Sequence, residues 1–227
     1  MKRSAARAVA AEMLGSALLT ATVIGSGIMA ERLAMGNTAV ALLANTGATV
    51  AVLAVLINLL APVSGGHFNP AVSLAMALRR ALPWSRAGAY VGVQIVGCFA
   101  GMLLAHAMFD LPLLQTSTHA RSGVGQWLSE IVATAGLLFV VLAHRRASDA
   151  AWLVAAWIGA AYWFTASTSF ANPAITIARA FTDTFAGIRP VDAPGFIVAQ
   201  LAGGMLTVLV ARHAITTPAS TLESPRG

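Results

Sequence analysis

The sequence predicts an all-α membrane protein, in which six transmembrane helices and two shorter re-entrant half-helices form an inverted repeat. Three observations predict this fold. The 227-residue chain is 58% hydrophobic and only 10% charged, whereas a soluble domain is usually about 25% charged. Six apolar stretches are long enough to cross a bilayer, and the tripeptide Asn-Pro-Ala occurs twice, at 69–71 and 172–174. We therefore expect residues 1–227 to form a single transmembrane domain.

Six stretches have the length of a membrane-spanning helix, which needs about 20 mostly apolar residues. They are residues 8–30, 38–61, 87–108, 126–144, 150–168 and 194–214. The first is longer than the core of a signal peptide, so it is interpreted as a retained span. The third carries Gly97 and Gly101 at a spacing that permits close helix contact. The polar residues 215–227 are expected to form a disordered cytoplasmic tail.

Two further apolar segments, 69–78 and 172–181, are too short to span. At about 1.5 Å per residue, each covers about half of a hydrocarbon core roughly 30 Å thick. Each begins with an asparagine, which can cap free helix N–H groups, followed by a proline, which suits the first helical turn. Irregular backbone at this depth must be buried in protein or line a water-filled cavity. The two tripeptides consist of Asn69, Pro70 and Ala71, and of Asn172, Pro173 and Ala174.

The two halves of the chain repeat one another, the first over about 8–108 and the second over about 126–214. Glu12 lies early in the first half and Glu130 early in the second. Three spans in each half insert the second half upside down, so the two short helices are expected to meet head to head at the midplane. Their N-termini both carry partial positive charge. This arrangement predicts a pore that is unfavourable for cations.

Charge placement predicts the orientation of the chain. The net charge is +6, but the basic residues form short clusters between apolar spans and not one patch, which argues against nucleic-acid binding. By the positive-inside rule, the richer side is cytoplasmic and both termini lie there. The residues expected on that side are Lys2, Arg3, Arg7, Arg79, Arg80, Arg86, Arg145, Arg146, Arg212 and Arg226, against Arg32, Arg121, Arg179 and Arg189 on the other.

Glu12 and Glu130 are the acids placed well inside spans, where a charge costs on the order of 3 kcal/mol. One interpretation is a proton-coupled carrier. The other is structural: each carboxylate accepts hydrogen bonds from the loop that leads into a half-helix, and their paired position favours this reading. The sequence contains no hydrolase, zinc-protease or phosphate-loop motif, and its one cysteine lies in an apolar stretch. It predicts neither an enzyme nor a cofactor.

The doubled tripeptide, the three-plus-three repeat and the paired glutamates resemble the aquaporins, or major intrinsic proteins, over about residues 8–214. The string Ser-Gly-Gly-His-Phe-Asn-Pro-Ala-Val at 64–72 is similar to the family's first pore loop. The resemblance implies a bundle of six helices around the half-helices, a homotetramer in the lipid bilayer and one pore per subunit. Asn69 and Asn172 would donate N–H groups to a neutral solute, and His67 would line the pore.

The family's second constriction, the aromatic/arginine filter, is carried over by distance from the tripeptides. It falls on Thr49, Ala160, Ser169 and Ile175, the last directly after the second tripeptide, where most members have arginine. These residues provide no large aromatic side chain and no fixed cation, so the resemblance implies a wide opening. Arg179 lies one helical turn beyond Ile175. It is expected to pair with Asp183; its alternative role is to replace the missing arginine.

The segment Asn-Pro-Ala-Ile-Thr-Ile-Ala-Arg at 172–179 resembles a bacterial branch of the family, some members of which are associated with arsenic resistance. The resemblance implies passive flux of water, glycerol and metalloid hydroxides such as arsenite across the inner membrane of a bacterium. A water-selective pore is the nearest alternative. An ion-coupled secondary transporter is a further one, since it requires ionisable groups at the midplane.

Overall fold

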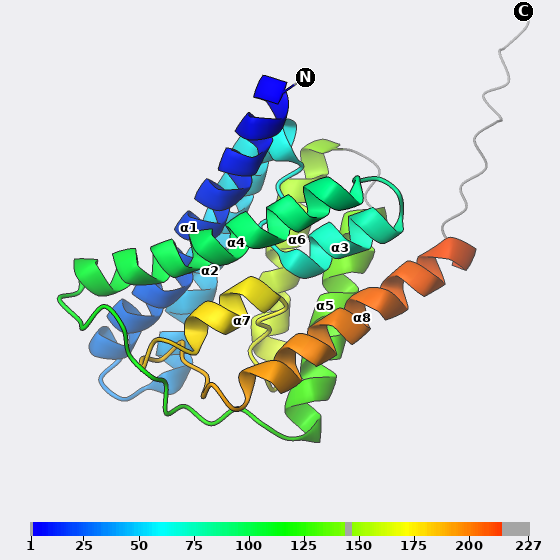
Figure 1. The fold of residues 1–227 in the computed structure, drawn as a ribbon. Coiled ribbons are helices and arrows are strands. Elements are labelled where there is room, and N and C mark those ends of the chain that lie inside the picture. Colours follow the sequence, from blue (N-terminus) through cyan, green and yellow to red (C-terminus); the bar gives the residue numbers. More distant parts are fainter. Residues whose placement is uncertain (1, 144–146, 215–227) are drawn as a thin grey trace, which may run out of the picture.

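The computed structural model describes residues 2–143 and 147–214, which form eight α-helices (Figure 1). The predicted tail 215–227 and the arginines at 145, 146 and 226 lie outside the described residues. The helices are α1 (Lys2–Leu33), α2 (Thr38–Ser64), α3 (Pro70–Leu78), α4 (Trp84–Met108), α5 (Val124–Ala143), α6 (Ala147–Phe164), α7 (Pro173–Arg179) and α8 (Ala193–Ala214).

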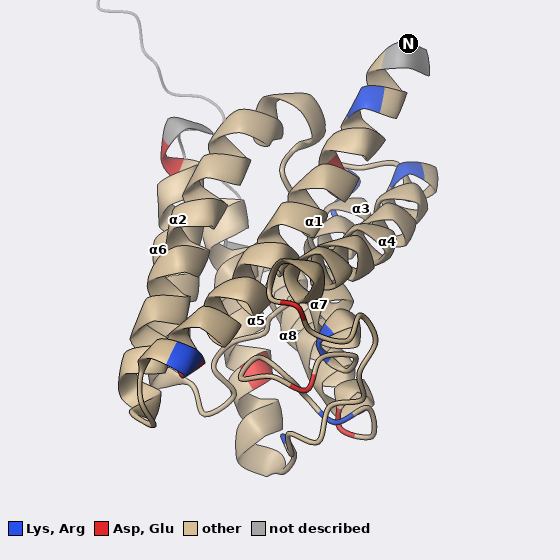
Figure 2. Cartoon of the chain, turned by 90° about the vertical axis from the view of Figure 1, so that its left-hand side faces the viewer, with Lys and Arg blue, Asp and Glu red and all other residues tan. Residues whose placement is uncertain are grey.

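The described helices fit the predicted membrane fold. Five of them, α1, α2, α4, α5 and α8, are long and apolar enough to cross a bilayer. The sixth expected span, α6, is the shortest of the long helices at 18 residues and packs against α2 and α5. Charged residues gather toward the two ends of the bundle (Figure 2). The prediction of an all-α membrane fold is confirmed.

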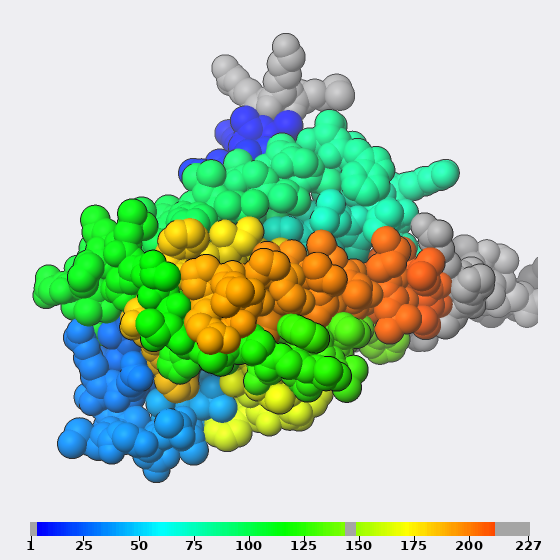
Figure 3. Space-filling view, turned by 60° about the horizontal axis from the view of Figure 1, so that its bottom comes forward, coloured from blue at the N-terminus to red at the C-terminus, as the bar shows by residue number. Residues whose placement is uncertain are grey.

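The two halves pack in the same way. α1 lies against α4 and α2, and correspondingly α5 lies against α8 and α6. Close approach depends on glycine in both halves: a Cβ at Gly101 would lie 2.1 Å from the carbonyl oxygen of Ala17, and a Cβ at Gly203 would lie 2.4 Å from that of Ile131. The close contact predicted from the spacing of Gly97 and Gly101 is therefore present. α8 crosses one face of the molecule as a continuous orange band in Figure 3.

The half-helices α3 and α7 occupy the interior and contact each other. The side-chain oxygen of Asn69 accepts a hydrogen bond from the Ala71 N–H at 2.9 Å. That of Asn172 accepts from the Ala174 N–H at 3.0 Å. Each asparagine is thus the N-cap of its half-helix, with proline in the first turn. A capped helix start requires no partner from the bilayer, so it is stable at this depth.

Two predicted helix ends differ from the structure. α2 continues through Pro62 to Ser64 because proline removes one hydrogen bond only, and the left-handed Gly65 closes the helix with a 2.9 Å bond to the Ala61 carbonyl. α6 ends at Phe164, four residues before the expected end. The chain after it must turn sharply, since Thr168 adopts a positive φ of 59° that no helix accommodates.

Candidate functional site

The loop that leads into α3 is held by the buried carboxylate of Glu12. One oxygen accepts hydrogen bonds from the Ser64 hydroxyl at 2.7 Å and the His67 N–H at 2.9 Å. The other accepts from the Phe68 N–H at 2.7 Å and the Gln94 amide at 2.8 Å. Four donors converge on one carboxylate, which offsets the cost of removing its charge from water.

The same construction recurs in the second half around Glu130. One oxygen accepts from the Ser167 hydroxyl at 2.5 Å and the Phe170 N–H at 2.9 Å. The other accepts from the Ala171 N–H at 2.8 Å and the Gln200 amide at 2.6 Å. The observed geometry matches the structural interpretation of the two glutamates, with every carboxylate oxygen occupied twice.

Gln94 and Gln200 were not among the predicted site residues, although they connect the carboxylates to the half-helices. Gln94 also donates to the Ser73 hydroxyl, and Gln200 to the Thr176 hydroxyl, both at 2.9 Å. The signal was present in the sequence: each is a lone amide inside an apolar span, where a polar side chain needs a partner.

Asn69 and Asn172 tie the two halves together by reciprocal hydrogen bonds. The amide nitrogen of Asn69 donates to the Ala171 carbonyl at 2.7 Å, and that of Asn172 donates to the Phe68 carbonyl at 2.8 Å. With its oxygen capping a half-helix and one N–H used in this way, each side chain is fixed. One N–H of each amide is left over.

The two pore loops share a strained backbone but differ in residue type. Gly65 and Gly66 adopt positive φ values of 97° and 63°, which glycine accepts freely. The equivalent positions of the second loop are Thr168 and Ser169, with φ of 59° and 51°. A β-branched residue in this region is a genuine outlier. The surrounding hydrogen bonds to Glu130 hold the second loop in this form.

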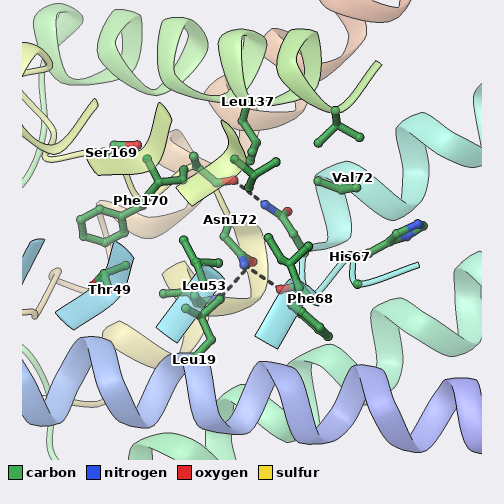
Figure 4. A pocket seen from close by; sticks show the side chains of 18 of the residues that line it. Leu19, Thr49, Leu53, His67, Phe68, Val72, Leu137, Ser169, Phe170 and Asn172 are labelled. Atoms are coloured by element: carbon green, nitrogen blue, oxygen red, sulfur yellow. Dashed lines mark hydrogen bonds between the residues drawn. The ribbon is translucent and has the colours of Figure 1, made fainter. Parts of the chain in front are cut away.

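A cavity of about 270 Å³ passes both asparagines (Figure 4). His67 lies at one end of the close-up view and Thr49, Ser169 and Phe170 lie at the other, with Asn172 between them. The long helices supply mostly aliphatic side chains, and among the lining residues there is no aspartate or glutamate. The aliphatic members include Leu19, Val23, Leu53, Ile57, Leu137, Val141, Val154 and Ile158.

His67 lies at the end of the cavity near α3, as expected for a lining residue. Its Nδ1 is 3.0 Å from the Ser73 hydroxyl. Its ring meets Tyr90 edge to face, with the centroids 5.5 Å apart. The Tyr90 hydroxyl donates to the Ser64 carbonyl at 2.8 Å. These contacts fix the imidazole at the cavity wall.

At the opposite end the structure brings together Thr49, Ser169 and Ile175, but not Ala160. Ala160 is exposed on the outside of α6 and does not line the cavity, so the prediction for this residue is wrong. Tyr162 takes its place, buried and with its hydroxyl 3.3 Å from that of Thr49. Two residues at about 100° each lie some 200° apart around a helix, which places Ala160 on the opposite face.

The expected pair of Arg179 and Asp183 is absent from the described part of the chain, where Asp183 instead accepts two hydrogen bonds from Thr118, at 2.8 and 2.9 Å. Arg179 is buried and lines the cavity. Its Nε donates to the Ala186 carbonyl, and its guanidinium lies 3.3 Å from the centroid of the Phe170 ring. The outer end of the cavity therefore contains both a large aromatic side chain and a fixed cation, contrary to the expectation from sequence.

Arg121, in the loop between α4 and α5, holds the outer loops together. It donates to the Gly187 carbonyl at 2.8 Å and lies 5.1 Å from the Phe170 ring on which Arg179 also packs. In the same loop, the backbone and side chain of Thr118 donate to Asp183 and hold the pKa of that carboxyl below its ordinary value. Sequence reasoning placed Arg121 only by its side of the membrane, since nothing local shows where a long loop folds back.

The fold and this site define a membrane protein of the channel class: two opposed half-helices in an inverted repeat, with a cavity passing both of their N-termini. Residues 1–165 match the family described as Major intrinsic protein. The chain is 54% identical over 210 residues to Aquaglyceroporin AqpS of Rhizobium meliloti (strain 1021), covering 91% of this chain and 89% of that protein. The chain belongs to the major intrinsic protein family, whose members are channels and not enzymes.

Other relatives agree on the fold and the family. Aquaporin-9 of Homo sapiens is 40% identical over 102 residues, which cover 44% of this chain and 34% of that protein. The solved structure of the aquaglyceroporin from Plasmodium falciparum superposes with a TM-score of 0.71 at 19% identity. It covers 93% of this chain and 97% of that chain, so nearly the whole bundle has the same fold.

Proposed function

We propose that this chain is a passive channel for small uncharged solutes, namely water, glycerol and metalloid hydroxides such as arsenite. The observation that carries the proposal is the pair of asparagines, Asn69 and Asn172, fixed by reciprocal hydrogen bonds on the wall of one cavity. Each holds one remaining amide N–H that a passing oxygen accepts. No covalent step and no cofactor are required.

The electrostatics of the cavity support selectivity for neutral solutes. Two helix N-termini point at its middle, each with about half a positive charge. No carboxylate lines the described cavity to balance them. A cation would lose its hydration shell and gain nothing in return. A water molecule that accepts from both asparagines has its hydrogens directed away from them, which interrupts the relay of protons.

The outer constriction is formed in this proposal by Thr49, Tyr162, Ser169 and Ile175, with Arg179 one turn further out. Aliphatic side chains line one wall, while the hydroxyls of Thr49 and Ser169 lie on the other side. The Ser169 hydroxyl has no hydrogen-bond partner within the described chain. Such a passage suits a small polyol, whose carbon chain contacts the apolar wall while its hydroxyls find donors and acceptors.

A water-selective pore is the second candidate, and a specific observation favours it. Tyr162 and Arg179 restore an aromatic side chain and a cation near the outer constriction, which narrows the passage that the sequence predicted to be wide. An ion-coupled carrier is disfavoured, since the two glutamates are each consumed by four hydrogen bonds.

The cellular setting belongs to the same proposal. We place the protein in the inner membrane of a bacterium, as a homotetramer with both termini in the cytoplasm. The distribution of basic residues supports this orientation. The high identity to a bacterial relative over nine-tenths of the chain supports the localisation.

Stopped-flow light scattering on proteoliposomes tests the proposal, with water, glycerol and arsenite as solutes. Wild-type protein should conduct all three, and Ile175→Arg should cut glycerol and arsenite flux while affecting water less. Arg179→Met, which installs the residue found at the equivalent position of α3, should raise glycerol flux. Water flux alone, unaffected by Ile175→Arg, would select the water-selective alternative.

A matched pair on α6 tests the corrected outer constriction. Tyr162→Ala should widen the passage and raise glycerol flux. Ala160→His should leave all fluxes unchanged, because residue 160 faces away from the cavity. A strong effect of Ala160→His with none from Tyr162→Ala would restore the assignment made by spacing.

A further inference from the structure

A second hollow lies on the outside of the bundle, away from the pore. It is an apolar groove of about 260 Å³ between α3, the first residue of α4 and α8. In Figure 3 the orange atoms of α8 run beside the cyan and blue-green atoms of the α3 region. The groove is lined by Ala71, Leu74, Ala75, Leu78, Trp84, Leu201, Gly204 and Met205. No charged or hydrogen-bonding side chain other than the Trp84 indole contributes to it.

We propose that this groove holds an acyl chain of an anionic phospholipid, whose phosphate is bound by Arg79, Arg80 and Arg86. The groove follows α3 from Ala71, near the middle of the bundle, to Leu78 at the end of the helix. Nine residues at about 1.5 Å each give about 14 Å, which matches one leaflet of a hydrocarbon core roughly 30 Å thick. The groove thus has the length of a lipid tail in one leaflet.

The charges that complete the site are adjacent to the groove in the chain. Arg79 and Arg80 directly follow the lining residue Leu78, and Arg86 lies two residues after the lining residue Trp84. The segment 79–86 contains no acidic residue. Basic groups beside a groove between membrane helices are the usual site for an anionic headgroup.

The three guanidinium groups are available for a ligand. Arg80 and Arg86 are exposed and Arg79 is half-buried. Within residues 2–143 and 147–214, none of them forms an ion pair or a side-chain hydrogen bond. By contrast, Arg32, Arg121, Arg179 and Arg189 all donate to a carbonyl or carboxylate. Trp84 marks the mouth of the groove, with 59% of its surface exposed, and tryptophan is favoured at the level of lipid headgroups.

Lipid titration of the full-length purified protein, followed by native mass spectrometry, tests the proposal. The probes are dioleoyl phosphatidylglycerol and dioleoyl phosphatidylcholine, which share their tails and differ in headgroup charge. Wild-type protein should bind the phosphatidylglycerol more tightly. Replacing Arg79, Arg80 and Arg86 together by glutamine should lower that affinity by at least about tenfold and abolish the preference.

Two further variants separate the proposal from general surface charge and from the groove's absence of a role. Replacing Lys2, Arg3 and Arg7 by glutamine removes the same charge without altering the groove, and the preference should survive. Leu201→Trp should fill the groove and weaken binding of both lipids. Flux of water through all variants should stay at the wild-type level, which shows that they fold.

Three results would overturn the inference. The first is an equal loss of preference in the two charge variants. The second is wild-type binding by Leu201→Trp, or full competition by glycerol phosphate, which has the headgroup chemistry without a tail. The third is a change of oligomeric state in Leu201→Trp, which would assign the groove to a contact between subunits.

Discussion

Replacing Glu130 by glutamine should destabilise the protein strongly, because the substitution reverses the polarity of one side of a fully used carboxylate. Each oxygen accepts two hydrogen bonds, from Ser167 and Phe170 on one side and from Ala171 and Gln200 on the other. Glutamine presents an NH2 group to one of these two pairs of donors. Two hydrogen bonds to a charged acceptor are lost and donors are brought face to face.

The magnitude follows from these contacts. A hydrogen bond to a charged group contributes about 1.5–3 kcal/mol, so losing two costs about 3–6 kcal/mol. Ser167→Ala removes a single donor and should cost about 1.5–3 kcal/mol. Because both changes release the loop before α7, the loss of solute flux should follow the loss of folded protein.

Denaturant titration in detergent micelles, followed by circular dichroism, measures the free energy of unfolding. Glu31→Gln is the matched control, since Glu31 is exposed at the end of α1, and it should change that free energy by less than about 0.5 kcal/mol. A Glu130→Gln protein within about 1 kcal/mol of the wild type would refute the structural role. Intact stability combined with a lost pH dependence of flux would instead indicate a proton-coupled carrier.

Three other predictions follow from the packing and the outer loops. Gly101→Ala should cost about 1–3 kcal/mol in the same titration, since its Cβ would collide with the backbone of α1, whereas Gly92→Ala, with nothing within 4 Å, should change stability by less than about 0.5 kcal/mol. Thr168→Gly should raise stability by about 1 kcal/mol by removing a left-handed β-branched residue, and an unchanged or lower value would contradict the strain argument. The Thr118 bonds lower the pKa of Asp183 in the folded state, so their contribution is present above the unfolded pKa and is lost as the pH falls through the folded one. Limited proteolysis of the outer loop should therefore be slow at neutral pH and fast below about pH 4, and Asp183→Asn should make it fast at both.

Local chemistry made much of this architecture predictable. An asparagine followed by proline caps and starts a helix wherever the chain places it, so both half-helices were predicted to begin where they do. Glu12 and Glu130 were expected to bind the pore loops because a charge inside an apolar span requires several partners. These inferences needed only the residues within one segment and the fact that the pattern occurs twice.

The outer end of the pore shows where sequence reasoning stopped. The cavity is lined by every fourth residue of α2 up to Ala61, eight before Asn69, and by every fourth residue of α6 up to Tyr162, ten before Asn172. A difference of two residues in the connecting loop turns a helix face by about 200°. Counting back from Asn172 therefore selected Ala160 on the wrong face.

The sequence alone determined the family, the inverted repeat, the two asparagine caps and the paired glutamates, because each depends on local propensity or on a repeated pattern. Only the tertiary structure decided which side chains face the solute at the outer end. Tyr162 reaches the cavity through the rotation of α6, and Arg179 is directed there by Phe170 and the Ala186 carbonyl. These contacts join segments whose relative position is fixed by packing across the bundle, and no spacing along the chain encodes it.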